Sequence, residues 1–357
     1  MPRSYSLFLI AILAGGGWFF IKGPGQGNLG KILSAYSQSR SRQSQSPFGF
    51  TPPYQGPSSG TQIPAQYASQ AAPAPAPPSP MFGGPAIRIA SFNIEIFGDK
   101  KASKTHVMWT LAAIIQNFHV VAIQEIRTQD DYFLDNFLRN YVNQNGRAYD
   151  KVIGPRLGRS SSKEQYAFLY DTAAIEVNPR MIYTLNDPDD LLHREPLVAM
   201  FRVRGPPPQQ AFTFVLINIH TDPDETDTEL DALGQVYQVV RRTAGGEDDI
   251  ILLGDLNVDD QHLGQLGRLE GIRPLVRGVY TNTLQTALYD NIVLHQLSTA
   301  EFSGRGGVFN FEQHFKLTRD QALQVSDHLP IWAEFSAYES AAPGRVATRE
   351  AATIRAQ

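Results

Sequence analysis

Residues 250–257 read Ile-Ile-Leu-Leu-Gly-Asp-Leu-Asn, an apolar run that ends in a glycine and an Asp/Asn pair. A short apolar run of this kind is typical of a buried strand. Gly254 lets the backbone turn sharply where the strand ends. Asp255 and Asn257 are two residues apart and therefore point to the same side of an extended chain. The stretch predicts a strand that carries a hydrogen-bond acceptor and an amide donor to its end.

Polar signatures at the ends of apolar runs recur elsewhere in the chain. They read Phe92-Asn93-Ile94, Gln124-Glu125-Ile126, Ile219-His220-Thr221 and Ser326-Asp327-His328. Together with the Asp/Asn pair they supply a candidate metal carboxylate, two imidazoles and an Asp-His doublet. Metal-assisted cleavage of a phosphodiester needs groups of these kinds. The ordered set therefore predicts a nuclease-like enzyme.

The carboxylate of Glu125 is the first candidate metal ligand. It directly follows the apolar residues 120–123 and Gln124, and a carboxylate in such surroundings is costly to bury unless it is paired or bound to a metal. Magnesium prefers hard oxygen ligands and often uses only one or two carboxylates. The chain contains no cysteine, so thiolate catalysis and zinc-thiolate sites are excluded.

The two histidines of the signatures are candidate proton-transfer groups. Hydrolysis of a phosphodiester needs an activated water and a protonated leaving oxygen, and two imidazoles with different pKa values can supply both near neutral pH. Each imidazole needs a carboxylate that fixes its tautomer. Glu164 and Asp290 are available as partners for His220 and His328.

Alternating and β-branched segments predict many strands and few helices. Strands are expected over residues 87–97, 120–126, 166–177, 197–203, 212–220, 250–253, 291–294 and 331–335, and helices over 104–116, 130–143 and 225–242. This order favours two packed sheets with helices outside rather than a doubly wound parallel sheet. Hydrophobic residues make up 42% of the chain, enough for one large core.

Charge and composition divide the chain into four parts. Residues 1–22 are an apolar segment behind Arg3, interpreted as an uncleaved membrane anchor or a cleaved signal peptide; either would export the rest of the chain. Residues 23–85 are rich in Ser, Gln, Pro and Ala, and predict a disordered linker. Residues 86–337 form the predicted catalytic domain, with a net charge of −10, and residues 338–357 a tail. An acidic domain argues against a broad basic nucleic-acid surface and favours a site whose cation attracts phosphate.

Residues 87–335 resemble the endonuclease/exonuclease/phosphatase superfamily, and within it the deoxyribonuclease I branch. Besides the five signatures, the resemblance includes residues 158–166, Arg194-Glu195-Pro196 and Tyr289-Asp290-Asn291-Ile292-Val293. It implies an α/β fold, a four-layered α/β-sandwich of two packed mixed β-sheets flanked by helices. It also implies Mg²⁺ as cofactor, with Mn²⁺ as an alternative and Ca²⁺ as a structural ion.

The resemblance also implies roles for particular residues. Glu125 would bind the cation, helped by Asn93 and Asp327. His220, paired with Glu164, would protonate the leaving oxygen. His328, paired with Asp290, would activate water. Asp255 and Asn257 would orient the nucleophile and the phosphate. Arg127 and Arg194 would contact double-stranded DNA.

Several positions depart from the family pattern. Ser162 stands where the family places an aromatic residue in the minor groove, and Glu95 replaces a basic DNA contact. Leu284-Gln285 replace the Ser/Thr residues before the Tyr-Asp motif, and the family's disulfides are missing. We therefore expect an exported, membrane-anchored or secreted endonuclease of low sequence specificity that leaves 5′-phosphate and 3′-hydroxyl ends. The alternatives are a phosphodiesterase or phosphatase acting on a lipid or small phosphoester, and a non-catalytic binding module.

Overall fold

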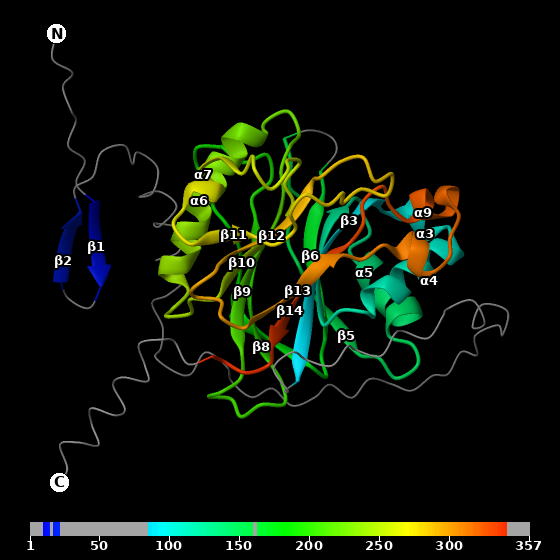
Figure 1. The fold of residues 1–357 in the computed structure, drawn as a ribbon, viewed down its shortest axis with the longest axis horizontal. Helices are drawn as coiled ribbons and strands as arrows, with labels where there is room; N and C mark the ends of the chain where they lie inside the picture. Colours follow the sequence, from blue (N-terminus) through cyan, green and yellow to red (C-terminus); the bar gives the residue numbers. More distant parts are fainter. Residues whose placement is uncertain (1–9, 15–16, 22–84, 160–162, 341–357) are drawn as a thin grey trace.

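The computed structural model describes residues 10–14, 17–21, 85–159 and 163–340. Two six-stranded sheets pack face to face, and helices lie on both outer surfaces (Figure 1). Each sheet contains one parallel pair of strands among antiparallel neighbours. This arrangement confirms the predicted four-layered α/β-sandwich of two mixed sheets.

The first sheet holds the strands that carry Asn93 and Glu125. Its strand order is β13-β14-β3-β4-β6-β5, with β3 and β4 parallel. The bounds are β3 Ala86–Phe97, β4 Val120–Ile126, β5 Tyr149–Ile153, β6 Gln165–Asp171, β13 Phe302–Val308 and β14 Ile331–Ser336. The register between β3 and β4 is irregular between Asn93 and Phe97, so the end of β3 bends away from regular pairing at the candidate site.

The second sheet holds the strands that carry His220 and Asp255. Its order is β11-β12-β10-β9-β8-β7, with β9 and β10 parallel. The bounds are β7 Ile175–Thr184, β8 Leu197–Val203, β9 Thr213–His220, β10 Ile250–Asp255, β11 Ile272–Pro274 and β12 Asp290–His295. In this register Asp255 lies beside His220 on one neighbour and beside Asp290 on the other.

Three apolar layers hold the sandwich together. The central layer lies between the sheets and contains Phe168, Phe201, Leu253 and Phe335, all fully buried. Strands β4, β9 and β10 are apolar on both faces because each face meets another layer. Burial of this much apolar surface is the main force that stabilises the fold.

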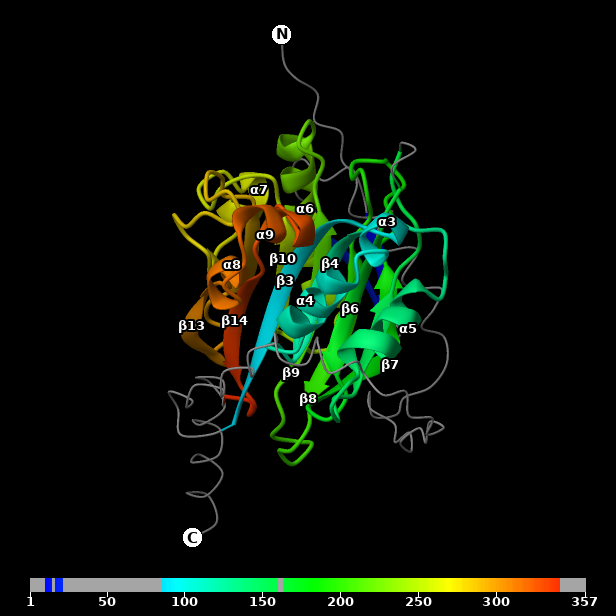
Figure 2. The same ribbon diagram turned by 90° about the vertical axis from the view of Figure 1, so that its right-hand side faces the viewer.

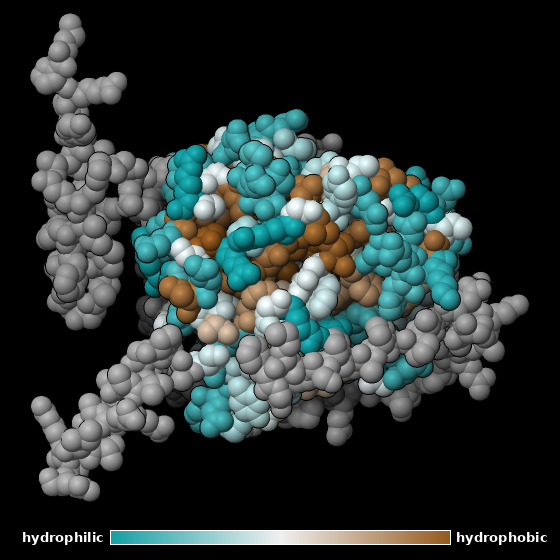
Figure 3. Space-filling view, in the orientation of Figure 1, coloured by the Kyte–Doolittle hydropathy of each residue, from teal (hydrophilic) through white to brown (hydrophobic). Residues whose placement is uncertain are grey.

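Helices cover the outer face of each sheet. Figure 2 shows α4 and α5 in front of β3, β4 and β6, and Figure 1 shows α6 and α7 on the outer side of the second sheet. Hydrophilic residues cover most of the two flanks of the molecule in the view of Figure 3, whereas hydrophobic residues gather between them. The helices are α3 Asp99–Ala102, α4 Thr105–Ile115, α5 Phe133–Phe137, α6 Thr226–Thr243, α7 Gly264–Arg268, α8 Phe311–His314 and α9 Arg319–Val325.

Two predicted elements differ from the structure. The single strand expected over residues 166–177 is wrong, because the chain turns back after Asp171 and forms β6 and β7 in different sheets. The helix expected over residues 130–143 is only partly present, as α5 followed by a π-helical turn at Leu138–Val142. Strands β5, β11 and β13 and the short helices α3, α7, α8 and α9 have no counterpart among the predicted elements.

The N-terminal segment has two described strands, β1 Ile10–Ala14 and β2 Gly17–Ile21, which pair in antiparallel fashion. Within the part of the chain that the structure describes, no helix is both long and apolar enough to cross a membrane. The membrane anchor or signal segment expected over residues 1–22 stays a prediction. The predicted linker, apart from residue 85, and most of the predicted tail lie outside the described residues. Export of the catalytic domain stays a prediction.

Candidate active site

The first imidazole-carboxylate pair joins the two sheets. His220 ends β9, and Glu164 precedes β6 of the other sheet. His220 Nδ1 lies 2.9 Å from Glu164 Oε1, and both residues are buried. Tyr166 fixes the backbone of the histidine, because its hydroxyl accepts from His220 N at 3.0 Å. The carboxylate thereby sets the tautomer and leaves Nε2 facing the site.

The second pair has the same form. His328 lies directly before β14, and its Nδ1 is 2.9 Å from Oδ2 of Asp290, the first residue of β12. The hydroxyl of Ser326 accepts from His328 N at 3.0 Å and donates to the carbonyl oxygen of Asn93 at 2.7 Å. This serine therefore ties the second histidine to β3.

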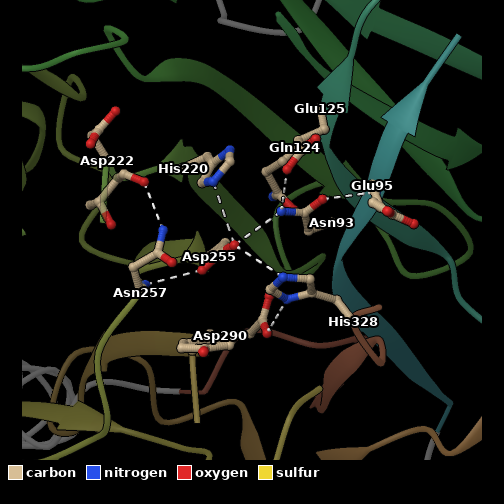
Figure 4. A network of polar contacts seen from close by, with 12 residues as sticks. Asn93, Glu95, Gln124, Glu125, His220, Asp222, Asp255, Asn257, Asp290 and His328 are labelled. Carbon is tan, nitrogen blue, oxygen red and sulfur yellow. Dashed lines mark hydrogen bonds and ion pairs between the residues drawn. The ribbon is translucent and has the colours of Figure 1, made fainter. Parts of the chain in front are cut away.

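Asp255 lies between the two imidazoles. Its Oδ2 is 3.5 Å from Nε2 of His220 and 3.5 Å from Nε2 of His328, and Figure 4 shows both rings directed toward it. Its Oδ1 accepts from Asn257 N at 3.0 Å, while the side-chain amide of Asn257 donates to the carbonyl oxygen of Thr221 at 2.8 Å. The predicted Asp/Asn pair is thus brought together with both predicted imidazole pairs.

Glu125 and Asn93 form the neighbouring part of the site. Asn93 Nδ2 donates to Asp255 Oδ2 at 3.0 Å and to Glu125 Oε1 at 3.2 Å. Glu125 has a left-handed backbone conformation with φ of 63°, which costs a residue other than glycine roughly 1–2 kcal/mol. The conformation directs Glu125 Oε2 to the backbone N–H of Ile96 at 2.9 Å. Backbone strain of this kind is characteristic of functional sites.

The two arginines predicted to contact DNA lie beside these carboxylates. Arg127 Nη2 is 3.1 Å from Glu125 Oε2 and 3.4 Å from Glu164 Oε2, and the side chain is 24% exposed. Arg194 is buried, with Nη1 donating to the carbonyl oxygen of His220 at 3.1 Å. Arg127 can therefore reach solvent from the site, whereas the buried Arg194 holds the backbone of His220. Their contact with DNA stays a prediction.

The carboxylates raise the pKa of both histidines despite burial. Burial lowers the pKa of His220, but Glu164 and Asp255 raise it, and the net shift is upward. Burial also lowers the pKa of His328, but Asp290 and Asp255 raise it well above its usual value. Each ring therefore holds a proton more strongly than a free imidazole does, and the surroundings of the two rings differ.

Comparison with known sequences agrees with this geometry. The sequence profile of the endonuclease/exonuclease/phosphatase family matches residues 90–328. This range includes His328 and the strand ends that carry Asn93, Glu125, His220 and Asp255. The chain belongs to the endonuclease/exonuclease/phosphatase family. It is 32% identical to deoxyribonuclease-1-like 1 of Sus scrofa over 265 residues, covering 71% of this chain and 82% of that protein.

Other relatives place this family member in the same branch. Deoxyribonuclease gamma of Rattus norvegicus is 31% identical, with 70% of this chain and 85% of that protein covered. These relatives confirm the resemblance to the deoxyribonuclease I branch. The fold is shared with an endonuclease/exonuclease/phosphatase family protein from Bacteroides thetaiotaomicron, at a TM-score of 0.50 and 16% identity over 71% of this chain and 98% of that one.

The oxygen atoms beside Glu125 fit the hard divalent cation that the family implies. Burial raises the pKa of Glu95, Lys101 lowers it, and the carboxylates of Asp327 and Glu125 raise it, with a net upward shift. Three carboxylates thus repel one another at this mouth, where a cation would relieve the repulsion. Asp327 is 54% exposed and 4.0 Å from His328 Nε2. Carboxylate and amide oxygens of this kind suit Mg²⁺ or Mn²⁺.

A second group of potential ligands lies deeper, where Asp255, Asp290 and His328 have ligand atoms within 4.8 Å of one another. Asp290 Oδ2 already bonds to His328 Nδ1, which is the contact expected of a residue that orients an imidazole. Proton transfer by His328 with Asp290 and Asp255 stays a prediction. Metal binding by Glu125, Asn93 and Asp327 stays a prediction.

One supporting residue, Lys101, could not be found from the sequence signatures. Lys101 is buried, and its Nζ donates to the carbonyl oxygens of Ile94 and Val325, each at 2.7 Å. Burial lowers its pKa to about 8. Lys101 therefore joins the end of β3 to the end of α9, on either side of the site. A lysine in the polar stretch 99–104 gives no sign of this in the sequence.

Of the positions that depart from the family pattern, Glu95 lies among the described residues and Ser162 does not. Glu95 is half-buried at the mouth of the site, 3.7 Å from Lys101 Nζ, and its backbone N–H donates to Asn93 Oδ1 at 2.9 Å. A negative charge therefore stands beside the candidate metal site, as the sequence indicates.

Proposed function

We propose that this chain is a divalent-metal-dependent endonuclease that hydrolyses double-stranded DNA with low sequence specificity. The observation that carries the proposal is the position of Asp255 Oδ2, 3.5 Å from the Nε2 atoms of both His220 and His328. Two imidazoles with separate carboxylate partners can act on one phosphorus centre from two sides. Hydrolysis of a phosphodiester requires such an acid and such a base.

The proposed proton transfers follow from the two pairs. His220, kept protonated by Glu164, donates a proton to the leaving oxygen. His328, oriented by Asp290, accepts a proton from the attacking water. Asp255 orients that water, and Asn257 binds a phosphate oxygen through its amide. The leaving oxygen that receives the proton is the 3′ oxygen of the phosphodiester. Cleavage of its bond to phosphorus leaves 5′-phosphate and 3′-hydroxyl ends.

Glu125 would hold the Mg²⁺ or Mn²⁺ ion, with Asn93 positioning its carboxylate and Asp327 beside it. The bound ion would neutralise the negative charge that develops on the phosphate. Asn93 donates to both Glu125 and Asp255, so the metal carboxylate and the carboxylate that orients water are held at a fixed separation.

DNA as substrate is supported by the relatives and by one exposed cation. Several curated relatives are named deoxyribonucleases, and Arg127 is a partly exposed guanidinium at the site. A guanidinium grips phosphate with paired hydrogen bonds. The negative charge of Glu95 repels phosphate at the same site. We propose that it lowers the affinity for DNA without changing the hydrolysis reaction.

The test is cleavage of supercoiled plasmid by the full chain with Mg²⁺ or Mn²⁺. We expect metal-dependent nicking that EDTA stops and that His220→Ala abolishes. His262→Ala is a matched control, because His262 is exposed and bonds only to the neighbouring Asp259 among the described contacts. Absence of nicking by the folded chain, together with hydrolysis of a small or lipid phosphoester, would exclude DNA as substrate.

A further inference from the structure

Four carboxylates gather at the end of the sandwich away from the active site. Asp249 precedes β10, six residues before Asp255, a separation of roughly 20 Å along an extended strand. Ligand oxygens of Asp249, Glu301 and Glu339 lie within 4.8 Å of one another. Glu247 joins them, because one of its carboxylate oxygens accepts from Asp249 N at 2.9 Å. We call these four residues the carboxylate cluster.

Two oxygens of the carboxylate cluster are buried without a hydrogen-bond donor. Asp249 Oδ1 and Glu301 Oε2 have no partner in the described part of the chain, and each of these residues is only 2% exposed. The buried hydroxyl oxygen of Thr299 faces Asp249 and likewise has no partner of regular geometry. Burying a carboxylate oxygen without a hydrogen-bond donor costs free energy. A positively charged species between these atoms would lower that cost.

Hydrogen bonds to Glu301, Glu339 and Glu247 hold the geometry of the carboxylate cluster. Glu301 Oε1 accepts from Ser340 N at 2.5 Å, and Glu339 Oε1 accepts from Thr213 N at 2.8 Å. Glu247 accepts from the hydroxyl of Thr213. Backbone N–H groups thus hold one carboxylate oxygen of Glu301, of Glu339 and of Glu247, while Asp249 Oδ1 and Glu301 Oε2 stay without a hydrogen bond.

We propose that Asp249, Glu301 and Glu339 bind a hard divalent cation, with the hydroxyl of Thr299 as a further oxygen ligand. Carboxylate and hydroxyl oxygens suit Ca²⁺ or Mg²⁺, and the absence of nitrogen and sulfur ligands disfavours softer metals. The site is separate from the active site and does not depend on the proposed nuclease activity. Its role is structural.

The ligands come from three segments that lie far apart in the sequence. Asp249 precedes β10, Glu301 precedes β13, and Glu339 follows β14. The segment after β14 pairs with the second sheet, through Phe212 N to the carbonyl oxygen of Ala337 at 3.0 Å and a bridge between Ala211 and Tyr338. A cation at this point joins the last described residues of the domain to both sheets and stabilises the folded state by mass action.

The protonation of the carboxylate cluster agrees with this geometry. Burial and the negative charges of its neighbours raise the pKa of Asp249 to about 10. Burial is also the main reason that the pKa of Glu247 rises to about 7. Without a cation Asp249 therefore retains its proton at neutral pH, and a bound cation would take the place of that proton.

The test measures bound ions and thermal stability in the full chain carrying Glu125→Gln, which removes the candidate active-site ligand. Equilibrium dialysis with Ca²⁺, and separately with Mg²⁺, gives the number of ions per chain. We expect Glu301→Gln to remove one ion per chain. We also expect it to abolish most of the rise in Tm that the ion produces, while Tm in chelator is unchanged or higher because one repelling charge is gone.

Glu270→Gln is the matched control, because Glu270 is an exposed acid outside the carboxylate cluster and the charge change is the same. It is expected to retain the ion and the rise in Tm. If Glu301→Gln does not fold, Glu339→Gln gives the same comparison at a less buried position. Unchanged ion number and unchanged rise in Tm in these variants would overturn the proposal and leave a cluster that only shares protons. The ion that is lost, Ca²⁺ or Mg²⁺, identifies the ligand.

Discussion

Gly254 and Ile219 approach each other so closely that a side chain at the glycine cannot be accommodated. A β-carbon on Gly254 would lie 1.8 Å from the carbonyl oxygen of Ile219, and the glycine has φ of 156°. These two residues are register partners in the parallel pair of β9 and β10 and directly precede His220 and Asp255. The contact therefore sets the distance between an imidazole and the carboxylate that faces it.

Gly254→Ala is expected to lower both stability and activity. The added methyl group must push β10 away from β9, and overpacking of this kind costs about 1–3 kcal/mol. A displaced Asp255 should reduce turnover even in molecules that remain folded. Chemical denaturation gives the first effect and plasmid nicking the second. Wild-type stability and rate in this variant would show that the glycine is not required.

Substitution of either active-site imidazole should remove most activity without unfolding the chain. We expect His220→Ala and His328→Ala to lower the rate by about 10²–10⁴, the usual contribution of a general acid or base. His262→Ala is expected to retain the wild-type rate. Near-normal turnover in either active-site variant, at unchanged metal occupancy, would show that the assigned role is wrong.

The two carboxylate partners should shift opposite limbs of the pH–rate profile. Glu164 raises the pKa of His220 and Asp290 raises that of His328, so loss of either charge lowers the pKa of its histidine. Because a general acid must be protonated, Glu164→Gln should move the alkaline limb to lower pH. Because a general base must be neutral, Asp290→Asn should move the acid limb to lower pH. Shifts of the same limb in both variants would contradict the division of roles.

The strand ends could be predicted because buried strands leave a strong pattern in sequence. Glu125, His220 and Asp255 each end an apolar run, and parallel neighbours bring such ends to one edge of the fold. The pairing of His220 with Glu164 followed from the resemblance, and the structure confirms the contact. Periodicity alone could not have given it, because Glu164 comes from the other sheet.

Other features depend on tertiary contacts that no local pattern records. Residues 166–177 are apolar enough for one strand, and the turn after Asp171 is set by the packing of two sheets. Strand β13 includes Gly304, Gly306 and Gly307, which weaken a strand signal. The burial of Lys101 and the meeting of Asp249 with Glu301 likewise join segments far apart in sequence.

Glu95→Gln should strengthen the binding of duplex DNA. Glu95 is a half-exposed negative charge beside Glu125 and Asp327, and its removal lowers the repulsion of phosphate. We expect a several-fold lower Kd at low salt in a catalytically inactive His220→Ala background. Asp131→Asn, at an exposed carboxylate in the loop before α5, is the control. Weaker binding of both DNA and metal by Glu95→Gln would instead make Glu95 a metal ligand.

Without metal, the carboxylate cluster should make stability fall as pH rises. The folded-state pKa values of Glu247, about 7, and Asp249, about 10, lie above the value of about 4 in unfolded chains. The native state therefore binds more protons than the unfolded state across that window, and the free energy of unfolding decreases with increasing pH. Denaturation in chelator at pH 5 to 9 should show a shallower decrease for Asp249→Asn than for the wild type. An equal slope would exclude the cluster as its cause.

The nature of the cleaved ends tests the central claim most directly. Plasmid nicked by the full chain in Mg²⁺ is purified and treated with DNA ligase, which joins only a 5′-phosphate to a 3′-hydroxyl. We predict that ligase restores closed circles without prior phosphorylation. We also predict that Glu125→Gln and His328→Ala produce few nicks to seal. Nicks that ligase cannot close, or nicking that persists at the wild-type rate in both variants, would contradict the assignment of these residues to phosphodiester hydrolysis.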